Sequence, residues 1–370
     1  MKENIFNNIE DEKGLFKDES YLYPDYLPER LPNRDKEIDE IASCLKPLCS
    51  GKKGRNLFLS GPTGVGKTAC VKYVLRELEE YTSKAKGLYI NCFQINSRYG
   101  ILAEIINFLG YAFPRRGLSA DEANSKIKEA IVKIGFKPII VLDEFDRTMV
   151  REEGSRVLYD LLRITEHNHK GFTIVLISND RGVTARLDDR VRSSLMAEEM
   201  VFEAYTPAQL KEILKERGEN AFWEIDKEVI ALAAAHSAKL GGDARIAIES
   251  LLVAGRIAEK EGTALKTLHL KNAFETVDAA SALKAIPYLE EKEEKMLRII
   301  VENGEITSGK LYEEFGKTTK LKERTMRQLL ESLVNLNIVK TETVEMGNKG
   351  KTKKITTKAQ SKAVLEKLGK

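Results

Sequence analysis

Apolar and polar positions in roughly the first 200 residues alternate in a pattern that predicts a parallel α/β sheet. Short apolar runs, each long enough for one buried strand, are separated by stretches in which apolar residues recur every three or four positions. Strands that alternate with helices favour a parallel sheet covered by helices on both faces. We expect Asn33 to cap the first helix. The expected strands cover about 57–60, 87–91, 137–142, 172–177 and 200–203, and the expected helices about 38–45, 71–81, 100–109, 121–134 and 155–167.

The pattern changes to helices alone at Tyr205 and becomes mixed again near residue 285. Thr206 and Pro207 have the residue types of a helix N-cap and first turn, and helical periodicity then continues to Val277. The last part predicts helices at about 286–301, 307–315 and 322–336, and strands at about 338–344 and 353–357. This is the order of a winged helix. The expected domains are a sheet domain with an N-terminal arm, a helical lid and a winged helix, over residues 1–204, 205–284 and 285–370.

A glycine-rich loop follows the first predicted strand and precedes a helix. Residues 61–68 read Gly-Pro-Thr-Gly-Val-Gly-Lys-Thr, a full match to G-x-x-x-x-G-K-[ST] in its proper context. Glycines let backbone N–H groups point inward at a phosphate, and the helix start adds partial positive charge. Lys67 would reach the β- and γ-phosphates, and the Thr68 hydroxyl would hold Mg²⁺. We therefore expect ATP or ADP with Mg²⁺ here, held by Gly61, Pro62, Thr63, Gly64, Val65, Gly66, Lys67, Thr68 and Ala69.

Two further predicted strands end in polar residues, and in a parallel sheet such ends share one edge with the glycine loop. Asp143 and Glu144 follow four apolar residues. Asp143 is placed to orient Mg²⁺, and Glu144 to polarise the attacking water as a general base. Asn179 follows the next strand and either contacts that water or the γ-phosphate, or simply caps its strand.

Residues on both sides of the sheet domain complete the expected nucleotide site. Leu31, Pro32 and Arg34 precede the phosphate loop and would wall the base pocket, unless this arm merely packs on the domain. Tyr205, at the start of the lid, is assigned to the same site. Arg245 lies near the start of a predicted helix, where the helix dipole disfavours a positive charge. This cost is explained if Arg245 points to a phosphate on the neighbouring domain.

Composition narrows the class of protein. The apolar fraction of 42% and the charged fraction of 32% describe a soluble globular protein, and no apolar run approaches the ~20 residues of a membrane span. The first residues lack the apolar core of a signal peptide, so we expect a cytoplasmic, nucleoid-associated protein with no membrane partner. The four cysteines have no metal-ligand spacing and are expected to be reduced thiols.

The net charge is only +3, so any nucleic-acid surface must be local. From Lys340 to Lys370 nine lysines and three glutamates give +6. A basic hairpin beside a basic helix face fits duplex DNA, with the helix in the major groove and the wing over the backbone. The alternative is a protein-docking winged helix. The expected DNA contacts are Arg324, Thr325, Arg327, Gln328, Lys349, Lys351 and Lys353.

The order of these motifs, together with residues 187–195 and 242–245, resembles the AAA+ replication initiators of archaea over essentially the whole chain. These are relatives of the large origin-recognition-complex subunit and of the cell-division-cycle helicase-loading factor. The resemblance implies a AAA+ P-loop ATPase domain, an all-α lid and a C-terminal winged helix. It also implies that Asn179 is the sensor-1 residue and Arg245 the sensor-2 arginine.

The resemblance also assigns roles to two other segments. Arg190 lies where an arginine finger is supplied to a neighbouring subunit. Clamp-loader relatives carry Ser-Arg-Cys nearby, whereas this chain has Ser-Ser-Leu at 193–195, so Arg190 and Arg192 are both candidates. A helical insertion that touches DNA is expected within about 98–120, with Arg115 and Arg116 as its contacts.

The function implied is ATP-dependent recognition of double-stranded origin DNA and loading of the replicative helicase, together with other initiator subunits. ATP and ADP would act as a switch, with slow hydrolysis. Two other classes are compatible with the same residues. One is a remodelling or clamp-loader-type motor ATPase, and the other is a nucleotide-gated winged-helix transcription regulator.

Overall fold

A computed structural model describes residues 14–112, 119–149, 153–166, 171–319, 321–345 and 351–369. Its contacts divide the chain into two compact units. The sheet unit comprises residues 27–209 and 241–244, and the lid–winged-helix unit comprises the described parts of 14–26, 210–240 and 245–369. This division cuts across the expected domain boundaries, which stay a prediction. No helix in the described ranges is both long and apolar enough to cross a lipid bilayer.

The sheet unit contains a parallel sheet with five strands among its described residues, in the order β2-β3-β4-β1-β5. Because β4 pairs with β1 on one side and β3 on the other, the loops that follow these three strands are neighbours at one edge. The strands are β1 (Leu57–Ser60), β2 (Ala85–Asn91), β3 (Lys137–Asp143), β4 (Thr173–Ser178) and β5 (Glu198–Val201).

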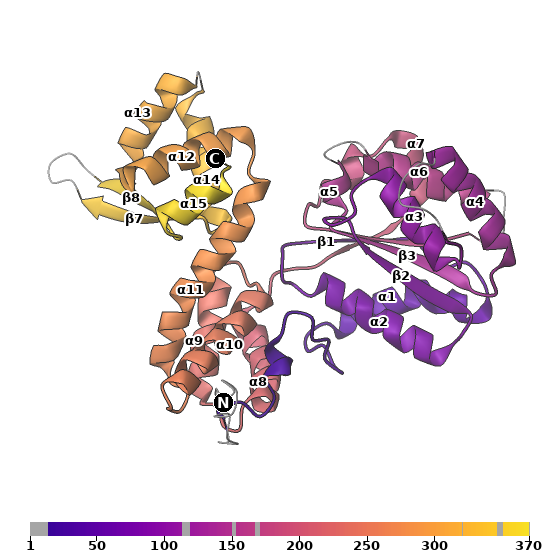
Figure 1. Ribbon diagram of the computed structural model, residues 1–370, viewed down its shortest axis with the longest axis horizontal. Helices are drawn as coiled ribbons and strands as arrows, with labels where there is room; N and C mark the ends of the chain where they lie inside the picture. Colours follow the sequence, from indigo (N-terminus) through magenta and orange to yellow (C-terminus); the bar gives the residue numbers. More distant parts are fainter. Residues whose placement is uncertain are drawn as a thin grey trace, which may run out of the picture. The chain divides into compact units, whose positions relative to one another are not determined.

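Helices cover both faces of this sheet (Figure 1). Alternate residues of one strand enter different cores, as the pleat requires: Phe58 packs with one set of helices and Leu57 with the other. Because both faces of the sheet are buried, the sequences of the inner strands β1, β3 and β4 are nearly continuous apolar runs. On one side lie α1 (Asp35–Leu45) and α2 (Lys67–Tyr81), and on the other α3 (Arg98–Phe108), α4 (Ala120–Lys133), α6 (Glu153–Glu166) and α7 (Asp189–Leu195).

The predicted cap of the first helix is wrong. The N-cap position of α1 is occupied by Arg34, and its side chain makes no capping hydrogen bond. Asn33 adopts a left-handed conformation with φ of +62° one residue earlier. Asp35 and Glu37 in the first turn supply the negative charge that the helix start favours.

Four long helices form the lid part of the second unit: α8 (Pro207–Ala221), which begins in the sheet unit, α9 (Lys227–Lys239), α10 (Ala244–Lys260) and α11 (Thr267–Ala285). The predicted start of α8 is confirmed. The Thr206 hydroxyl accepts from the Gln209 amide at 3.3 Å, and the Gln209 side chain accepts from the Thr206 amide at 2.9 Å.

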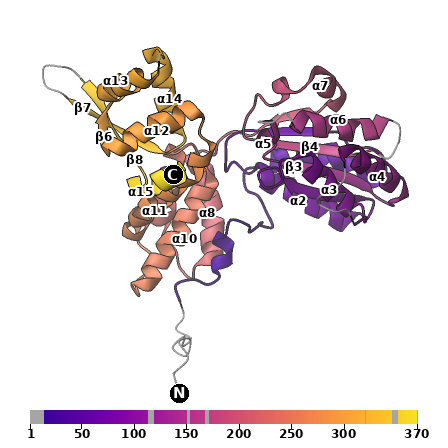
Figure 2. The ribbon, with the colours of Figure 1, turned by 45° about the horizontal axis from the view of Figure 1, so that its top comes forward.

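The N-terminal arm, with a short 3-10 turn at Glu19–Leu22, packs on these lid helices (Figure 2). Phe16 stacks on Phe222 with ring centroids 4.7 Å apart. The amides of Lys17 and Asp18 donate to the Ala221 carbonyl at 2.8 and 3.1 Å. The arm therefore joins the lid at residues 14–26, before it reaches the sheet unit.

The C-terminal part is a winged helix, as predicted, with an antiparallel sheet in the order β6-β8-β7. The expected helix at 286–301 is a 3-10 turn, Ile286–Tyr288, followed by a separate helix. Strand β6 and helix α15 were not predicted. The elements are α12 (Glu291–Asn303), β6 (Glu305–Thr307), α13 (Ser308–Thr318), α14 (Glu323–Asn335), β7 (Val339–Glu345), β8 (Lys351–Thr357) and α15 (Ser361–Lys367).

Candidate nucleotide-binding site

The loop between β1 and α2 has the shape of a phosphate cradle. Gly61, Gly64 and Gly66 have φ angles of +147°, +69° and +91°, which glycine adopts at little cost. A Cβ on Gly61 would overlap the Phe202 carbonyl, and one on Gly66 would lie 2.7 Å from the Tyr205 hydroxyl. Both the conformation and the close neighbours therefore require glycine, and the loop fits a phosphate group.

The ammonium of Lys67 is held inside the curve of this loop. It donates to the carbonyls of Gly61 and Pro62 at 2.7 and 2.6 Å, and to Oδ1 of Asn179 at 3.1 Å. Only 6% of Lys67 is exposed. The third contact exists because β4, which ends before Asn179, lies next to β1. A positive charge and a polar amide thus meet at the phosphate loop.

The carboxylate of Asp143, which is 4% exposed, lies beside the Thr68 hydroxyl. Its Oδ2 accepts hydrogen bonds from Thr68 Oγ1 at 2.6 Å and from Tyr89 Oη at 2.7 Å, and its Oδ1 accepts from the Glu144 amide at 2.8 Å. A hydroxyl and a carboxylate in contact are oxygen ligands of the kind that Mg²⁺ prefers. Burial and the neighbouring carboxylate raise the pKa of Tyr89, so that its hydroxyl remains a donor.

Asp146, in the segment after β3, accepts hydrogen bonds from residues at the end of β4. Its Oδ1 accepts from the Ser178 hydroxyl at 2.9 Å and from the Asn179 amide at 3.2 Å. Glu144, two residues earlier, is half-buried and has a left-handed backbone with φ of +52°. Sequence reasoning missed Asp146 and Tyr89. The acidic run at 143–146 was a signal for the first, but only the strand order reveals the second.

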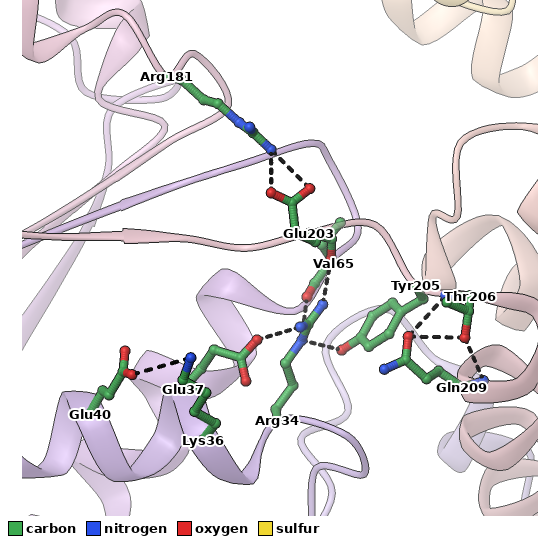
Figure 3. A network of polar contacts seen from close by, with 10 residues as sticks. All are labelled: Arg34, Lys36, Glu37, Glu40, Val65, Arg181, Glu203, Tyr205, Thr206 and Gln209. Atoms are coloured by element: carbon green, nitrogen blue, oxygen red, sulfur yellow. Dashed lines mark hydrogen bonds and ion pairs between the residues drawn. The ribbon is translucent and has the colours of Figure 1, made fainter.

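Arg34 fastens the phosphate loop to the segment that leaves β5 (Figure 3). Its Nε donates to the Val65 carbonyl at 3.0 Å and to the Tyr205 hydroxyl at 3.1 Å, and its Nη2 donates to the Glu203 carbonyl at 2.9 Å. The guanidinium also lies 4.2 Å from the centroid of the Tyr205 ring. Both side chains are buried, and burial raises the pKa of Tyr205 despite the nearby cation.

Comparison with known proteins agrees with this architecture. The AAA domain family matches residues 51–187, and the Cdc6 AAA+ ATPase-type lid domain family matches 211–275. ORC1-type DNA replication proteins are similar over nearly the whole chain. The protein of Thermococcus kodakarensis is 36% identical, and the match covers 95% of this chain and 90% of the relative. The ORC1-type protein 1 of Archaeoglobus fulgidus is 33% identical, and the match covers 99% of this chain and 93% of the relative. The chain belongs to the ORC1-type DNA replication proteins.

A solved structure of the Aeropyrum pernix ORC1 protein in complex with DNA is similar as well. Its sequence is 32% identical, the TM-score is 0.74, and the match covers 96% of this chain and 97% of that one. The predicted fold, a AAA+ domain with a Cdc6-type lid and a winged helix, is thereby confirmed for this ORC1-type chain.

The two finger candidates of this ORC1-type chain lie on α7. Arg190 is exposed in a surface hollow that it lines with Arg98 and Asp160, among others. Arg98 and Asp160 form a two-point ion pair at 2.6 and 2.9 Å. Arg192 is paired with Asp189 at 2.7 Å. Arg190 thus faces a polar surface that a neighbouring molecule could reach.

The remaining nucleotide-site candidates differ in their burial. Leu31 and Pro32 are half-buried, and Leu31 packs against the core formed with α1 and α2. Arg245 is exposed as the second residue of α10, in the lid–winged-helix unit.

The predicted DNA contacts gather on α14 and β8 of the winged helix. Arg324, Arg327 and Gln328 are exposed and Thr325 is half-buried, while Met326, on the opposite face, is in the core. On β8, Lys353 is exposed; Lys351 also belongs to this strand, but only its backbone is described. The other predicted contacts, Lys349, Arg115 and Arg116, lie outside the described residues.

Proposed function

We propose that this ORC1-type chain is an ATP-dependent origin-recognition protein that binds duplex DNA and helps to load the replicative helicase. The observation that carries the proposal is the similarity to the Aeropyrum pernix ORC1 protein in complex with DNA, because it extends over 96% of the chain. It therefore includes the phosphate loop and the winged helix together. Such a protein would work in the cytoplasm, associated with the nucleoid, and with other initiator subunits.

The nucleotide would be ATP or ADP with Mg²⁺, held by residues 61–69. Lys67 would neutralise the β- and γ-phosphates, and Thr68 and Asp143 would hold the metal. Leu31, Pro32 and Arg34 would wall the base, and Arg34 together with Tyr205 would also keep the loop in place. The contact of Thr68 with Asp143 at 2.6 Å supports this pairing of roles.

Hydrolysis would be slow and would reset the switch. Glu144 would accept a proton from the attacking water, and Asn179 would orient that water or the γ-phosphate. The hydrogen bond from Asn179 to Lys67 and the hold of Asp146 on the Asn179 backbone support this placement. Arg190 would act on the nucleotide of a neighbouring subunit, with Arg192 as the other candidate.

Arg245 would read the γ-phosphate from the lid, so that the bound nucleotide biases how the lid and the winged helix meet DNA. In the winged helix, Arg324, Thr325, Arg327 and Gln328 would enter the major groove. Lys349, Lys351 and Lys353 of the hairpin, and Arg115 and Arg116 of the sheet domain, would contact the backbone.

Footprinting on DNA next to the protein's own gene, with ATP and with ADP, tests this proposal. We expect a confined footprint that depends on the nucleotide and that disappears when residues 285–370 are removed. An unchanged footprint after this truncation would argue for a protein-docking winged helix. Rapid ATP turnover by a stable ring without DNA would instead favour a motor, and occupancy of many promoters would favour a transcription regulator.

A further inference from the structure

Residues 241–244, which lead into lid helix α10, pack directly on the phosphate loop within the sheet unit. The Ala244 amide donates to the Gly64 carbonyl at 3.1 Å. The carboxylate of Asp243, which is 8% exposed, fills the space where a side chain of Gly64 would lie, so that a Cβ there would overlap it. The apex of the phosphate loop is thus in contact with a segment nearly 180 residues further along the chain.

Two further glycines shape this segment. Gly241 and Gly242 both have left-handed backbones, with φ of +96° and +75°. A Cβ on Gly242 would lie 2.6 Å from the Tyr205 carbonyl oxygen. The segment 241–244 is therefore hydrogen-bonded to the phosphate loop through Ala244, and at Gly242 it lies close against the backbone of Tyr205, whose hydroxyl accepts from Arg34.

The charge of Asp243 makes this contact responsive to what the loop binds. A buried carboxylate beside a loop whose amides suit phosphate is repelled by bound phosphate groups, and the repulsion grows with their charge. The chain continues from Asp243 through Ala244 into α10 without an intervening loop. Ala247, Leu251 and Ala254 of that helix are buried, so a displacement at its start is passed on through a packed helix.

We propose that Asp243 is a positioning residue that couples the phosphate loop to lid helix α10. It acts through its contact with Gly64 and makes the start of the helix follow the charge state of the bound nucleotide. This inference rests on the proposed nucleotide switch and deepens it, because it names the residue through which the phosphate loop would act on the start of helix α10.

The contact itself is tested by a double-mutant cycle with Gly64→Ala and Asp243→Ala, read as affinity for ADP. Gly64→Ala weakens binding through its strained backbone and through displacement of the carboxylate. Gly64→Ala should lower the affinity for ADP by a certain factor in the parent protein. We expect this factor to be at least threefold smaller when Asp243→Ala is already present. Gly51→Ala, at φ of +72° with nothing within 4 Å, is the control for strain alone, and it should show no such coupling. Equal losses in both backgrounds would overturn the contact.

The coupling is tested by hydrogen exchange at nucleotide concentrations that saturate each variant. In the parent protein, exchanging ADP for ATP should change the protection of residues 61–69 and of 244–251 at least threefold. In Asp243→Ala the loop should still respond, while 244–251 should not. Asp226→Ala, which removes the carboxylate capping α9, controls for a weakened lid and should keep both responses.

These outcomes separate the two proposals. If Asp243→Ala retains the full response of 244–251, the role of Asp243 is wrong and the switch stands. If the parent protein shows a response of 244–251 but the same DNA affinity with ATP and ADP, the proposed function fails while the coupling stands. If the parent protein shows no response of 244–251 to the nucleotide, the coupling is refuted.

Discussion

The ammonium of Lys67 donates a hydrogen bond to Oδ1 of Asn179 at 3.1 Å, and this contact links the phosphate loop to the end of strand β4. The two residues are 112 positions apart in the sequence, and they meet because β4 pairs directly with β1. Lys67 has two further partners in the carbonyls of Gly61 and Pro62. The ammonium of Lys67 is therefore held by the carbonyls of its own loop as well as by Asn179.

Asn179→Ala should lower ATP turnover by roughly 100-fold while nucleotide affinity falls less than tenfold. The reason is that the loop carbonyls still hold Lys67, but the polar group that we propose to lie beside the γ-phosphate is lost. Single-turnover hydrolysis and fluorescent-nucleotide titration measure the two effects. Lys67→Ala is the matched comparison and should abolish binding itself. Turnover equal to that of the parent protein at saturating ATP would show that Asn179 only caps its strand.

Tyr89→Phe should reduce the gain in nucleotide affinity that Mg²⁺ provides by roughly tenfold. The Tyr89 hydroxyl donates to Asp143 at 2.7 Å, and groups that orient a metal ligand typically matter by this amount. The measurement is nucleotide affinity as a function of Mg²⁺ concentration, with an affinity in EDTA that should not change. Tyr81→Phe, whose side chain is 80% exposed, is the control. An identical Mg²⁺ titration for Tyr89→Phe would rule out this positioning role.

Local patterns in the sequence were enough to place the strands of the parallel sheet, most helices and the glycine loop, because apolar periodicity and the loop motif are short-range signals. Partners that depend on strand order were not predictable. Tyr89 reaches Asp143 only because β2 pairs with β3 in the register that places Asn91 opposite Asp143. The expected place of Arg34 in the wall of the base pocket stays a prediction. Its hydrogen bonds to the Val65 carbonyl and the Tyr205 hydroxyl were not predicted, because tertiary packing alone determines them.

Short elements were missed for a different reason. Strand β6 has three residues and helix α5 (Asp146–Met149) has four, which is too few to show a period. The helix expected at 286–301 was split because Pro287 lies in the 3-10 turn Ile286–Tyr288, whose backbone does not continue as an α-helix.

Gly255→Ala should destabilise the lid–winged-helix unit by about 1–3 kcal/mol, although alanine normally favours a helix interior. A Cβ at this position of α10 would overlap the ring of Phe16 and lie 2.7 Å from that of Phe222. Urea unfolding measures the change in free energy. Gly309→Ala, in helix α13 with nothing within 4 Å, is the matched control and should be neutral or stabilising.

The arm makes this prediction specific. Combining Gly255→Ala with Phe16→Ala removes one of the two rings, so the double variant should lose less stability than the sum of the single changes. Simple additivity would mean that the arm does not pack on α10 as described.

Asp278 of α11 links the lid to the winged helix. Its Oδ1 lies 3.2 Å from Nε2 of His236 on α9, and its Oδ2 accepts from the Lys358 ammonium, which follows β8, at 2.9 Å. Burial alone would raise the pKa of Asp278, but the hydrogen bonds and charges of His236 and Lys358 outweigh it and lower that pKa. The carboxylate is thus favoured in the folded state.

The stability that Asp278 contributes should disappear in acid. Because its folded pKa lies below the unfolded value of about 3.9, the contribution is fully present above about pH 5 and is lost as pH falls through the folded pKa. Asp278→Asn should therefore lower the unfolding free energy by about 2 kcal/mol at pH 6 and by clearly less at pH 3. Urea unfolding of both proteins from pH 6 to 3 measures this.

Glu291→Gln is the control. The pKa of Glu291 is also lowered, by Lys295, but its side chain is 81% exposed, so the change in unfolding free energy should be small at every pH. A difference between parent and Asp278→Asn that stays constant down to pH 3 would mean that the ion pair is not what holds the two parts together.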